Sequence, residues 1–434
     1  MAQSQEALAE STIRLLRWKF MPILLISYLA AYIDRVNTGF AAITANKDLG
    51  LSPSQFGFGA GLFFFGYCAA QVPSNMLMLK YGARVWFARI MISMGVLAAA
   101  NAFVVGVNSF YAVRLTLGIA EAGLLPGVVY FMRCWFPKRF RARYIAIFLL
   151  AIPLSSLIGS PISGALMGLD GWLGFKGWQW MYVIEGLPCI VCGFLILRGL
   201  AGSPAEAEWL TDEQRAWLAR EFAIEQANLV EPAKGLPWWA MVVDARVLTY
   251  GAAFFGITAG SYGLSLWLPL MVKGFGLSNL QTGFVVAIPF LFGSVATIVW
   301  ARHSDARQER VWHSVIPATV AAVGLASCAA ISGAPVLTMV ALTVAAIGIF
   351  GIRGPYFALQ TEEFSTTNAA PGIAWIDAFS ASGGFFGPLI VGWVKESTGS
   401  YSIALLVLAL LSLSGAVIVL GRARVNARRV AVQT

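Results

Sequence analysis

The stretch YLAAYIDRVNTGF, at residues 28–40, decides how the chain is interpreted. It places an acid, Asp34, beside a base, Arg35, within an apolar run that extends from Trp18 to about Ile43. A charge at the middle of a membrane-length helix costs about 2.5–3.5 kcal/mol on insertion scales. Both groups therefore need partners inside the protein. Adjacent helix positions point about 100° apart, so we expect the two side chains to face different neighbours rather than each other.

The composition excludes an ordinary soluble enzyme. Of the 434 residues, 58% are hydrophobic and 12% are charged, with a mean hydropathy of +0.74, whereas soluble domains carry about 25% charged residues. Apolar runs of about 18 residues or more indicate membrane spans. The sequence predicts an all-α integral membrane protein with twelve transmembrane helices in two pseudo-symmetric six-helix bundles. The expected spans are 19–43, 54–79, 84–107, 109–136, 142–169, 178–200, 246–272, 280–301, 311–333, 335–361, 369–394 and 400–421.

The positive charges predict the orientation. An even number of crossings puts both termini on one side, and most of the 30 Lys and Arg fall in segments on that side. Only Lys47, Lys176, Lys273 and Lys395 fall in segments on the opposite side. By the positive-inside rule we expect both termini in the cytoplasm and the protein in the cytoplasmic (inner) membrane. The net charge of +9 is explained by this topology and implies no nucleic-acid partner.

One long polar stretch divides the spans into two groups of six. We expect a cytoplasmic tail at 1–18, a first bundle at 19–200, a linker at 201–245, a second bundle at 246–421 and a second cytoplasmic tail at 422–434. Within the linker, Thr211 and Gln214 form a capping-box pattern that predicts a short amphipathic helix to about Gln226. The bundles are related, because GLSPSQFGF at 50–58 matches GLSNLQTGF at 276–284. At the same offset RVW at 84–86 recurs at 310–312, as expected of a two-lobed transporter.

Several motifs resemble those of the major facilitator superfamily and, within it, the anion:cation symporter family. They are YIDRVN at 32–37, RLTLGIAEAG at 114–123 followed by Pro126-Gly127, GSPISG at 159–164 and KGFGLS at 273–278. The cytoplasmic gate sequence of the superfamily, Gly-x-x-x-Asp-Arg-x-Gly-x-Arg, is altered in both halves. Leu79 replaces the first aspartate, while Ala306 and Gln308 depart from the pattern in the second half. The resemblance assigns gating roles to Lys80, Gly82, Arg84, Asp305 and Arg310.

The resemblance implies transport by alternating access, with spans 1, 4, 7 and 10 around a central cavity. It assigns proton coupling to Asp34 and Glu121 and anion binding to Arg35. Protons are the expected coupling ion, with sodium as the alternative, and no cofactor is expected. A buried acid whose cationic partner is taken by a substrate anion changes its proton affinity as the substrate arrives. This gives a minimal coupling mechanism, in which the proton resides on the acid and the anion on the arginine.

The second bundle offers two interpretations of Arg353 in span 10, where the flanking glycines and proline predict a bend. It is either a second cationic contact for substrate or the partner of Asp377 in a purely structural pair. Arg114 likewise forms a structural pair, with Glu185 at similar depth, or binds substrate. Other polar and aromatic side chains of the cavity spans are candidate substrate contacts, although packing is an alternative for each. They are Tyr32, Asn37, Tyr262, Trp267, Tyr356 and, as the alternative to its pairing with Arg353, Asp377.

Enzymatic and metal chemistry have little support in the sequence. It contains no phosphate loop and no nucleophile–His–acid set, and its two histidines, His303 and His313, share one short basic loop. The main hypothesis is a monomeric, proton-coupled importer of a small organic carboxylate, with membrane lipid as its other contact. An aromatic or dicarboxylic acid is favoured over a sugar acid. The alternatives are an anion exporter or antiporter, and a transporter-like sensor that binds the anion without moving it.

Overall fold

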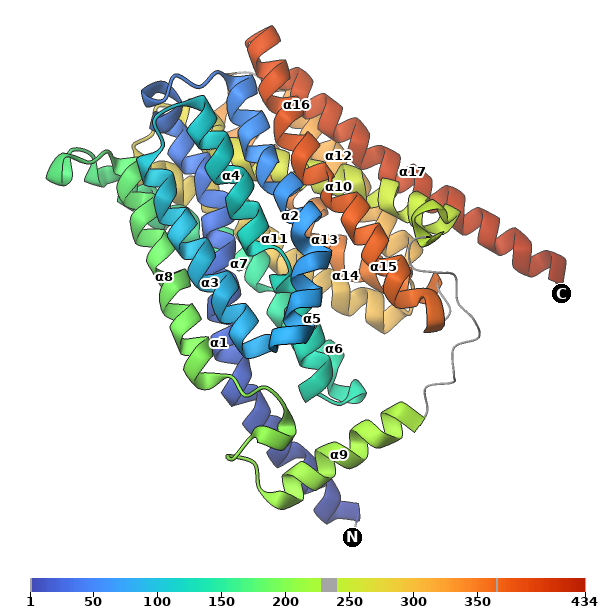
Figure 1. The fold of residues 1–434 in the computed structure, drawn as a ribbon. Helices are drawn as coiled ribbons and strands as arrows, with labels where there is room; N and C mark the ends of the chain where they lie inside the picture. The colour runs from blue at the N-terminus through green and yellow to red at the C-terminus, as the bar shows by residue number, and fades with distance from the viewer. Residues whose placement is uncertain (1, 228–239, 332, 364–365, 434) are drawn as a thin grey trace.

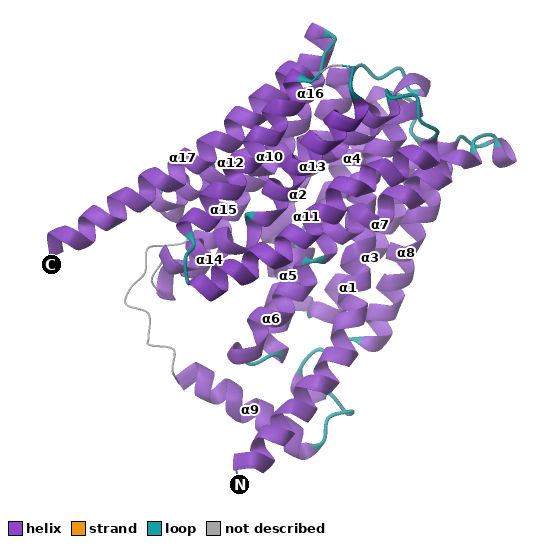
Figure 2. Ribbon diagram, turned by 180° about the vertical axis from the view of Figure 1, so that it is seen from behind, coloured by secondary structure: helices purple, strands orange, loops and turns teal. Residues whose placement is uncertain are grey.

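The computed structural model describes residues 2–227, 240–331, 333–363 and 366–433, and every regular element within these ranges is helical (Figures 1 and 2). Among the described residues, twelve helical segments are long and apolar enough to cross a membrane, which confirms the predicted fold class. The helices of the first half are α1 (Ala2–Asp48), α2 (Pro53–Tyr81), α3 (Ala83–Ala100), α4 (Val107–Glu121), α5 (Leu124–Trp135), α6 (Lys138–Leu149), α7 (Ala151–Leu166) and α8 (Gly177–Gly199). After α9 (Asp212–Ala227), the second half has α10 (Ala245–Lys273), α11 (Asn279–Arg307), α12 (Val311–Ala330), α13 (Pro335–Gly351), α14 (Arg353–Glu363), α15 (Thr366–Ala381), α16 (Gly383–Thr398) and α17 (Ser402–Gln433).

Four of the expected spans consist of two helices each: α4–α5, α6–α7, α13–α14 and α15–α16. Between α4 and α5 the chain passes through Gly123 with φ +91°, a conformation that strongly favours glycine. The Ser74 hydroxyl donates to the Ala122 carbonyl at 2.5 Å, which satisfies a backbone group near the end of α4. The break between α13 and α14 falls at Ile352, inside the predicted bend. These breaks shape the helices next to the site described below.

The internal repeat is visible in the way two helices begin. The Ser52 amide donates to the Gln55 side chain at 2.9 Å, and the Gln55 amide donates back to the Ser52 hydroxyl at 3.3 Å. Ser278 and Gln281 form the same reciprocal pair at 3.0 and 3.2 Å. The resulting helices, α2 and α11, have 29 residues each. Matching capping boxes therefore start matching helices in the two halves.

The two halves pack closely at the end opposite the termini. A Cβ added at Gly164 in α7 would lie 2.6 Å from the Asn279 carbonyl oxygen of α11, and one at Gly283 would lie 2.5 Å from the Ser160 carbonyl oxygen. At the same end Glu396 of α16 accepts hydrogen bonds from the Ser52 hydroxyl and the Ser54 amide, both at 2.8 Å. Small residues permit this close helix approach, as they do generally in membranes.

The linker helix α9 lies beneath the first half (Figure 1). Thr211 and Gln214 form the predicted capping box, with reciprocal hydrogen bonds of 3.2 Å. Leu210 and Leu218 are buried, and Trp209 stacks on Trp135 with ring centroids 5.8 Å apart. The helices α1 and α17 continue through residues 2–18 and 422–433 of the expected tails. Residues 228–239 of the expected linker lie outside the described ranges.

Candidate functional site

A buried ion pair lies at the centre of the first half. The Arg35 guanidinium of α1 donates to the Glu121 carboxylate at the end of α4, and both residues are almost completely buried. Asp34 and Arg35 form no ion pair with each other, as their adjacent helix positions predict. Because Arg35 has an acid partner, the cost of placing its charge at membrane depth is reduced. The pair joins a predicted anion-binding residue to a predicted proton-coupling residue.

Arg35 is also contacted from the second half. Its Nη1 donates to the Tyr262 hydroxyl of α10 at 3.1 Å, and this hydroxyl lies 2.7 Å from that of Tyr32. The guanidinium carbon lies 4.8 Å from the Tyr32 ring centroid, 5.1 Å from that of Phe63 and 5.0 Å from that of Tyr67. Cations are attracted to ring faces at such distances. Arg35 therefore lies in a box of aromatic rings that is completed by a hydroxyl from the other half.

Asp34 faces a different set of polar groups. The Asn37 amide donates to the Asp34 carboxylate at 3.4 Å and to the Glu185 carboxylate of α8 at 2.8 Å. Glu185 also accepts a hydrogen bond from the Ser163 hydroxyl of α7 at 2.7 Å. Asn37, a predicted substrate contact, thus bridges two buried acids within the first half.

Arg114 does not form the ion pair with Glu185 that the sequence allowed, because the two residues have separate partners. Its Nη1 donates to the Thr38 hydroxyl at 3.0 Å, and its guanidinium lies 5.0 Å from the Phe63 ring centroid. The side chain is fully buried. The same ring, Phe63, therefore contacts both Arg35 and Arg114.

Arg353 begins α14, directly after the break in span 10. Its Nη2 donates to the Ser261 hydroxyl of α10 at 3.3 Å, and its guanidinium lies 5.5 Å from the Phe350 ring centroid. Asp377 of α15 is within electrostatic reach of Arg353 but does not form an ion pair with it, and instead hydrogen-bonds with Gln71 of α2. Arg353 is also within electrostatic reach of Tyr32. The purely structural Arg353–Asp377 ion pair is therefore not formed in this conformation.

Two of the predicted aromatic contacts lie away from this cluster. Trp267 is buried near the outer interface between the halves, where its ring packs against Phe56 at 5.1 Å and its Nε1 donates to the Pro388 carbonyl at 3.3 Å. Tyr356 is fully buried in the second half, stacked on Phe254 at 4.6 Å and hydrogen-bonded to the Tyr250 carbonyl. Neither ring contacts Arg35 in this conformation.

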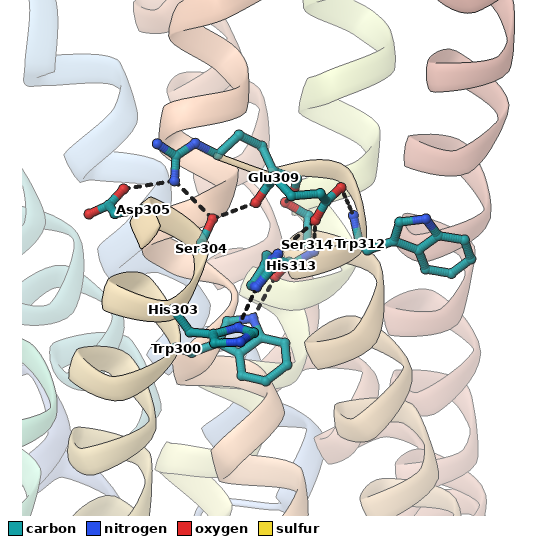
Figure 3. Close-up of polar contacts among 9 residues, drawn as sticks. Trp300, His303, Ser304, Asp305, Glu309, Trp312, His313 and Ser314 are labelled. Atoms are coloured by element: carbon teal, nitrogen blue, oxygen red, sulfur yellow. Dashed lines mark hydrogen bonds and ion pairs between the residues drawn. The ribbon is translucent and has the colours of Figure 1, made fainter. Parts of the chain in front are cut away.

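The predicted gating residues lie in two loops, one in each half, that differ in their ion pairs. Asp305 and Arg310 make an ion pair at 2.7 Å, and Arg310 also donates to the Ser304 hydroxyl at 2.9 Å (Figure 3). In the first half Gly82, with φ +81°, joins α2 to α3 between exposed Lys80 and exposed Arg84. No described residue forms an ion pair with Arg84, which agrees with the replacement of the gate aspartate by Leu79.

The sequence interpretation missed several neighbours of the site. Phe63 and Tyr67 surround Arg35, Ser163 continues the Asp34 network, and Ser261 holds Arg353. Glu185 was recognised as a charge inside an apolar span, but its expected partner was Arg114 and its partner here is Asn37. The missed residues are common in apolar spans and gave no signal. Within the described ranges, no three side chains are placed to bind a metal ion.

Comparisons with known proteins agree with this architecture. Residues 24–388 match the model of the Major Facilitator Superfamily. A protein of Agrobacterium vitis, named as a proposed tartrate transporter, is 42% identical over 97% of this chain and 93% of its own length. The quinolone resistance transporter of Acinetobacter baumannii is 36% identical over 94% of each chain.

Solved structures share the fold at low sequence identity. A bacterial homologue of the human lysosomal transporter Spinster, in an inward-facing and occupied conformation, superposes with a TM-score of 0.75. It is 16% identical, and the match covers 94% of this chain and 97% of that one. The family is one of transporters rather than enzymes. The matching family model, the extended relatives and the twelve-helix architecture together show that this chain belongs to the major facilitator superfamily.

Proposed function

We propose that the protein is a symporter that carries a small organic carboxylate together with protons across the cytoplasmic membrane. The observation that carries the proposal is the contact set of Arg35, which binds Glu121 in its own half and Tyr262 in the other half. A guanidinium presents a planar fork of donors that matches a carboxylate. A substrate carboxylate can therefore take the place of the Glu121 carboxylate on Arg35.

The exchange of partners supplies the coupling. An acid beside a cation favours its ionised form, and a buried acid that loses this cation favours its protonated form. When the substrate anion occupies Arg35, Glu121 takes up a proton. When the substrate leaves, Glu121 returns the proton and binds Arg35 again. Asp34, which is connected through Asn37 to Glu185, is the second proton-coupling group of the proposal.

The second cation supports the proposed substrate class. Arg353 lies on the second half within electrostatic reach of Tyr32, so a ligand with two acidic groups can contact both arginines. The aromatic box around Arg35 also suits a planar ring. The relative named as a proposed tartrate transporter supports a dicarboxylic acid, with an aromatic acid as the second class and a sugar acid as the third.

Two other functions fit the same fold. The relative named as a quinolone resistance transporter favours export of an organic acid, because the direction of a symporter or antiporter is set by gradients. A sensor that binds the anion without moving it uses the same residues. In each case we place the protein in the inner membrane as a monomer. The distribution of Lys and Arg favours cytoplasmic termini.

Proteoliposomes test the proposal directly. The wild-type protein should accumulate labelled dicarboxylate under an inward proton gradient and should also show counterflow without one. Glu121→Gln should lose proton-driven accumulation and keep counterflow, because the glutamine still leaves Arg35 for the substrate. Glu213→Gln, at the exposed start of α9 and outside this network, is the control and should keep both activities.

The outcomes separate the alternatives. Full accumulation by Glu121→Gln would overturn the proposed coupling. Accumulation driven by a sodium gradient instead would show that sodium is the coupling ion. Outward movement of the substrate, driven by an inward proton gradient, would identify an antiporter. Binding without counterflow would identify a sensor.

A further inference from the structure

The second half carries an apolar groove on its outer surface, between α11, α12 and α13. Its volume is about 270 Å³. The described residues that line it are Phe292, Val295, Ala296, Val299, Trp300, Ile316, Pro317, Val320, Ile347, Gly348 and Gly351. Neither Arg35 nor Arg353 lines the groove, so the groove is distinct from the anion site.

The groove exists because α13 ends beside it. At Gly348 the backbone of α13 lies against Pro317 and Ala321 of α12, too close for any side chain. One turn later, a Cβ added at Gly351 would lie 3.9 Å from each of its nearest neighbours, among them Trp300. The helices therefore separate at the point where α13 gives way to α14. The space that remains is open to the outer surface of the bundle.

This surface faces the lipid bilayer. Val295 is 51% exposed, Val299 is 58% exposed and Ile316 is 43% exposed, although all three are apolar. They belong to helices whose length and hydropathy suit a membrane span. An exposed apolar surface at membrane depth is normal, but a groove in it favours a ligand with a matching apolar chain.

The inner end of the groove changes from apolar to basic. On α11 the lining residues recur every three or four positions up to Trp300, and the same spacing continues to His303 and Arg307, which are both exposed. No described residue forms an ion pair with Arg307. Trp300 anchors this end by donating from Nε1 to the His313 carbonyl at 2.8 Å, and its ring lies beside those of His303 and His313 (Figure 3). Tryptophan and arginine are typical of the membrane–water boundary.

We propose that this groove binds an anionic phospholipid, with an acyl chain between α11 and α12 and the headgroup phosphate at His303 and Arg307. The order of the groups carries the inference: a continuous apolar groove, then an indole, then a hydrogen-bonding imidazole and an arginine that forms no ion pair with any described residue. A phospholipid presents the complementary order, and a hydrophobic protein segment would leave the basic end without an anionic partner. A single basic residue near an anionic membrane surface contributes about fivefold in affinity.

Native mass spectrometry of the purified full-length protein tests the site, with phosphatidylglycerol and phosphatidylethanolamine as probes. The wild type should retain one phosphatidylglycerol in preference to phosphatidylethanolamine. Ala296→Phe, which fills the groove, should lose this molecule, and Arg307→Gln should bind it about fivefold more weakly. Two matched controls should bind as the wild type does: Val323→Phe on an exposed part of α12 outside the groove, and Arg133→Gln at the end of α5. Equal loss in the controls, or no preference in the wild type, would overturn the proposal.

A second measurement tests the site without filling the groove. p-Benzoylphenylalanine at position 292, where the native phenylalanine is 48% exposed, should crosslink to phosphatidylglycerol when vesicles of that lipid and phosphatidylethanolamine are irradiated. Arg307→Gln in the same protein should reduce the phosphatidylglycerol adduct more than the phosphatidylethanolamine adduct, because only phosphatidylglycerol has a net negative charge. Equal adducts with both lipids, or a crosslink to a second copy of the chain, would show that the groove does not select an anionic lipid.

Discussion

The hydroxyl groups of Tyr32 and Tyr262 lie 2.7 Å apart, one on α1 and the other on α10. The Tyr262 hydroxyl also accepts a hydrogen bond from Arg35 at 3.1 Å. A single phenol oxygen therefore connects the second half both to the cation of the site and to the aromatic ring that covers this cation. Movement of the two halves relative to each other must change the environment of Arg35.

Removing the Tyr262 hydroxyl should weaken both contacts. Tyr262→Phe loses two buried hydrogen bonds, one of them to a charged group, and should cost about 1–3 kcal/mol in substrate binding or stability. Tyr32→Phe is the matched control, because it loses only the hydroxyl pair and keeps the Arg35–Tyr262 bond. The KM for uptake and the melting temperature of both variants measure the difference. Equal effects of the two substitutions would show that the Arg35 contact contributes nothing.

Arg353 should act on the substrate rather than on Asp377. Because the two side chains form no ion pair here, the double variant Arg353→Gln with Asp377→Asn should reduce uptake at least about tenfold, as expected for loss of a charge-assisted hydrogen bond. Asp377→Asn alone should keep most of the activity. Uptake by proteoliposomes, with size-exclusion profiles as a check of folding, measures both. Near-normal uptake by the double variant would assign the two residues a structural role.

The glycines at the outer interface should control the preference between conformations. Gly164→Ala or Gly283→Ala places a Cβ within 2.5–2.6 Å of a backbone oxygen in the opposite half, so the interface must separate. Gly351→Ala is the control, because its Cβ meets only ordinary contacts at 3.9 Å. Distances between spin labels on α7 and α11 should increase in the first two variants and stay constant in the third. Unchanged distances in all three would show that the halves can relax without separating.

Glu309 should stabilise the start of α12 in a pH-dependent way. Its carboxylate accepts hydrogen bonds from the Trp312 amide at 2.7 Å and the His313 amide at 3.1 Å, and it lies 2.6 Å from His313 Nδ1 (Figure 3). Partial burial raises the pKa of Glu309, but these hydrogen bonds outweigh it, so its pKa lies below the usual value of 4.5. The ionised form is therefore the stabilising one. Its contribution is complete well above pH 4.5 and is lost as the pH falls through the lowered pKa.

Glu309→Gln should thus lower the free energy of unfolding by about 1 kcal/mol at pH 7 and by less near pH 3, as for loss of a helix cap. Denaturation in detergent at several pH values measures the difference from the wild type. Asp305→Asn serves as the control, because Asp305 is 69% exposed and an exposed ion pair contributes little. An effect of Glu309→Gln that is independent of pH would contradict the assignment to the ionised carboxylate.

Local patterns in the sequence predicted much of this molecule. Hydropathy runs identified the twelve spans, and the Ser–Gln boxes identified the related starts of α2 and α11, because each pattern acts over a few neighbouring residues. The break after Glu121 was not foreseen, since the apolar run continues through it. It depends on the conformation of Gly123 and on a hydroxyl from α2.

The sequence predicted which residues belong to the site better than it predicted the contacts between them. Charged groups inside apolar spans marked Asp34, Arg35 and Glu121 as a group that needs partners. No sequence pattern could show that Glu185 would meet Asn37 rather than Arg114, because this depends on how α1, α4 and α8 are rotated. The orientation of Tyr356 was equally unpredictable, since it follows the break at Ile352 and buries its ring against Phe254.

The start of α2 has a consequence for how folding and transport are related. The Ser52 hydroxyl that accepts the Gln55 amide also donates to Glu396 of the other half. One oxygen atom thus helps to nucleate a helix and also holds the two halves together at their outer end. The atom cannot be optimised for one task without affecting the other. A substitution of Ser52 would therefore disturb both the start of α2 and the contact between the halves.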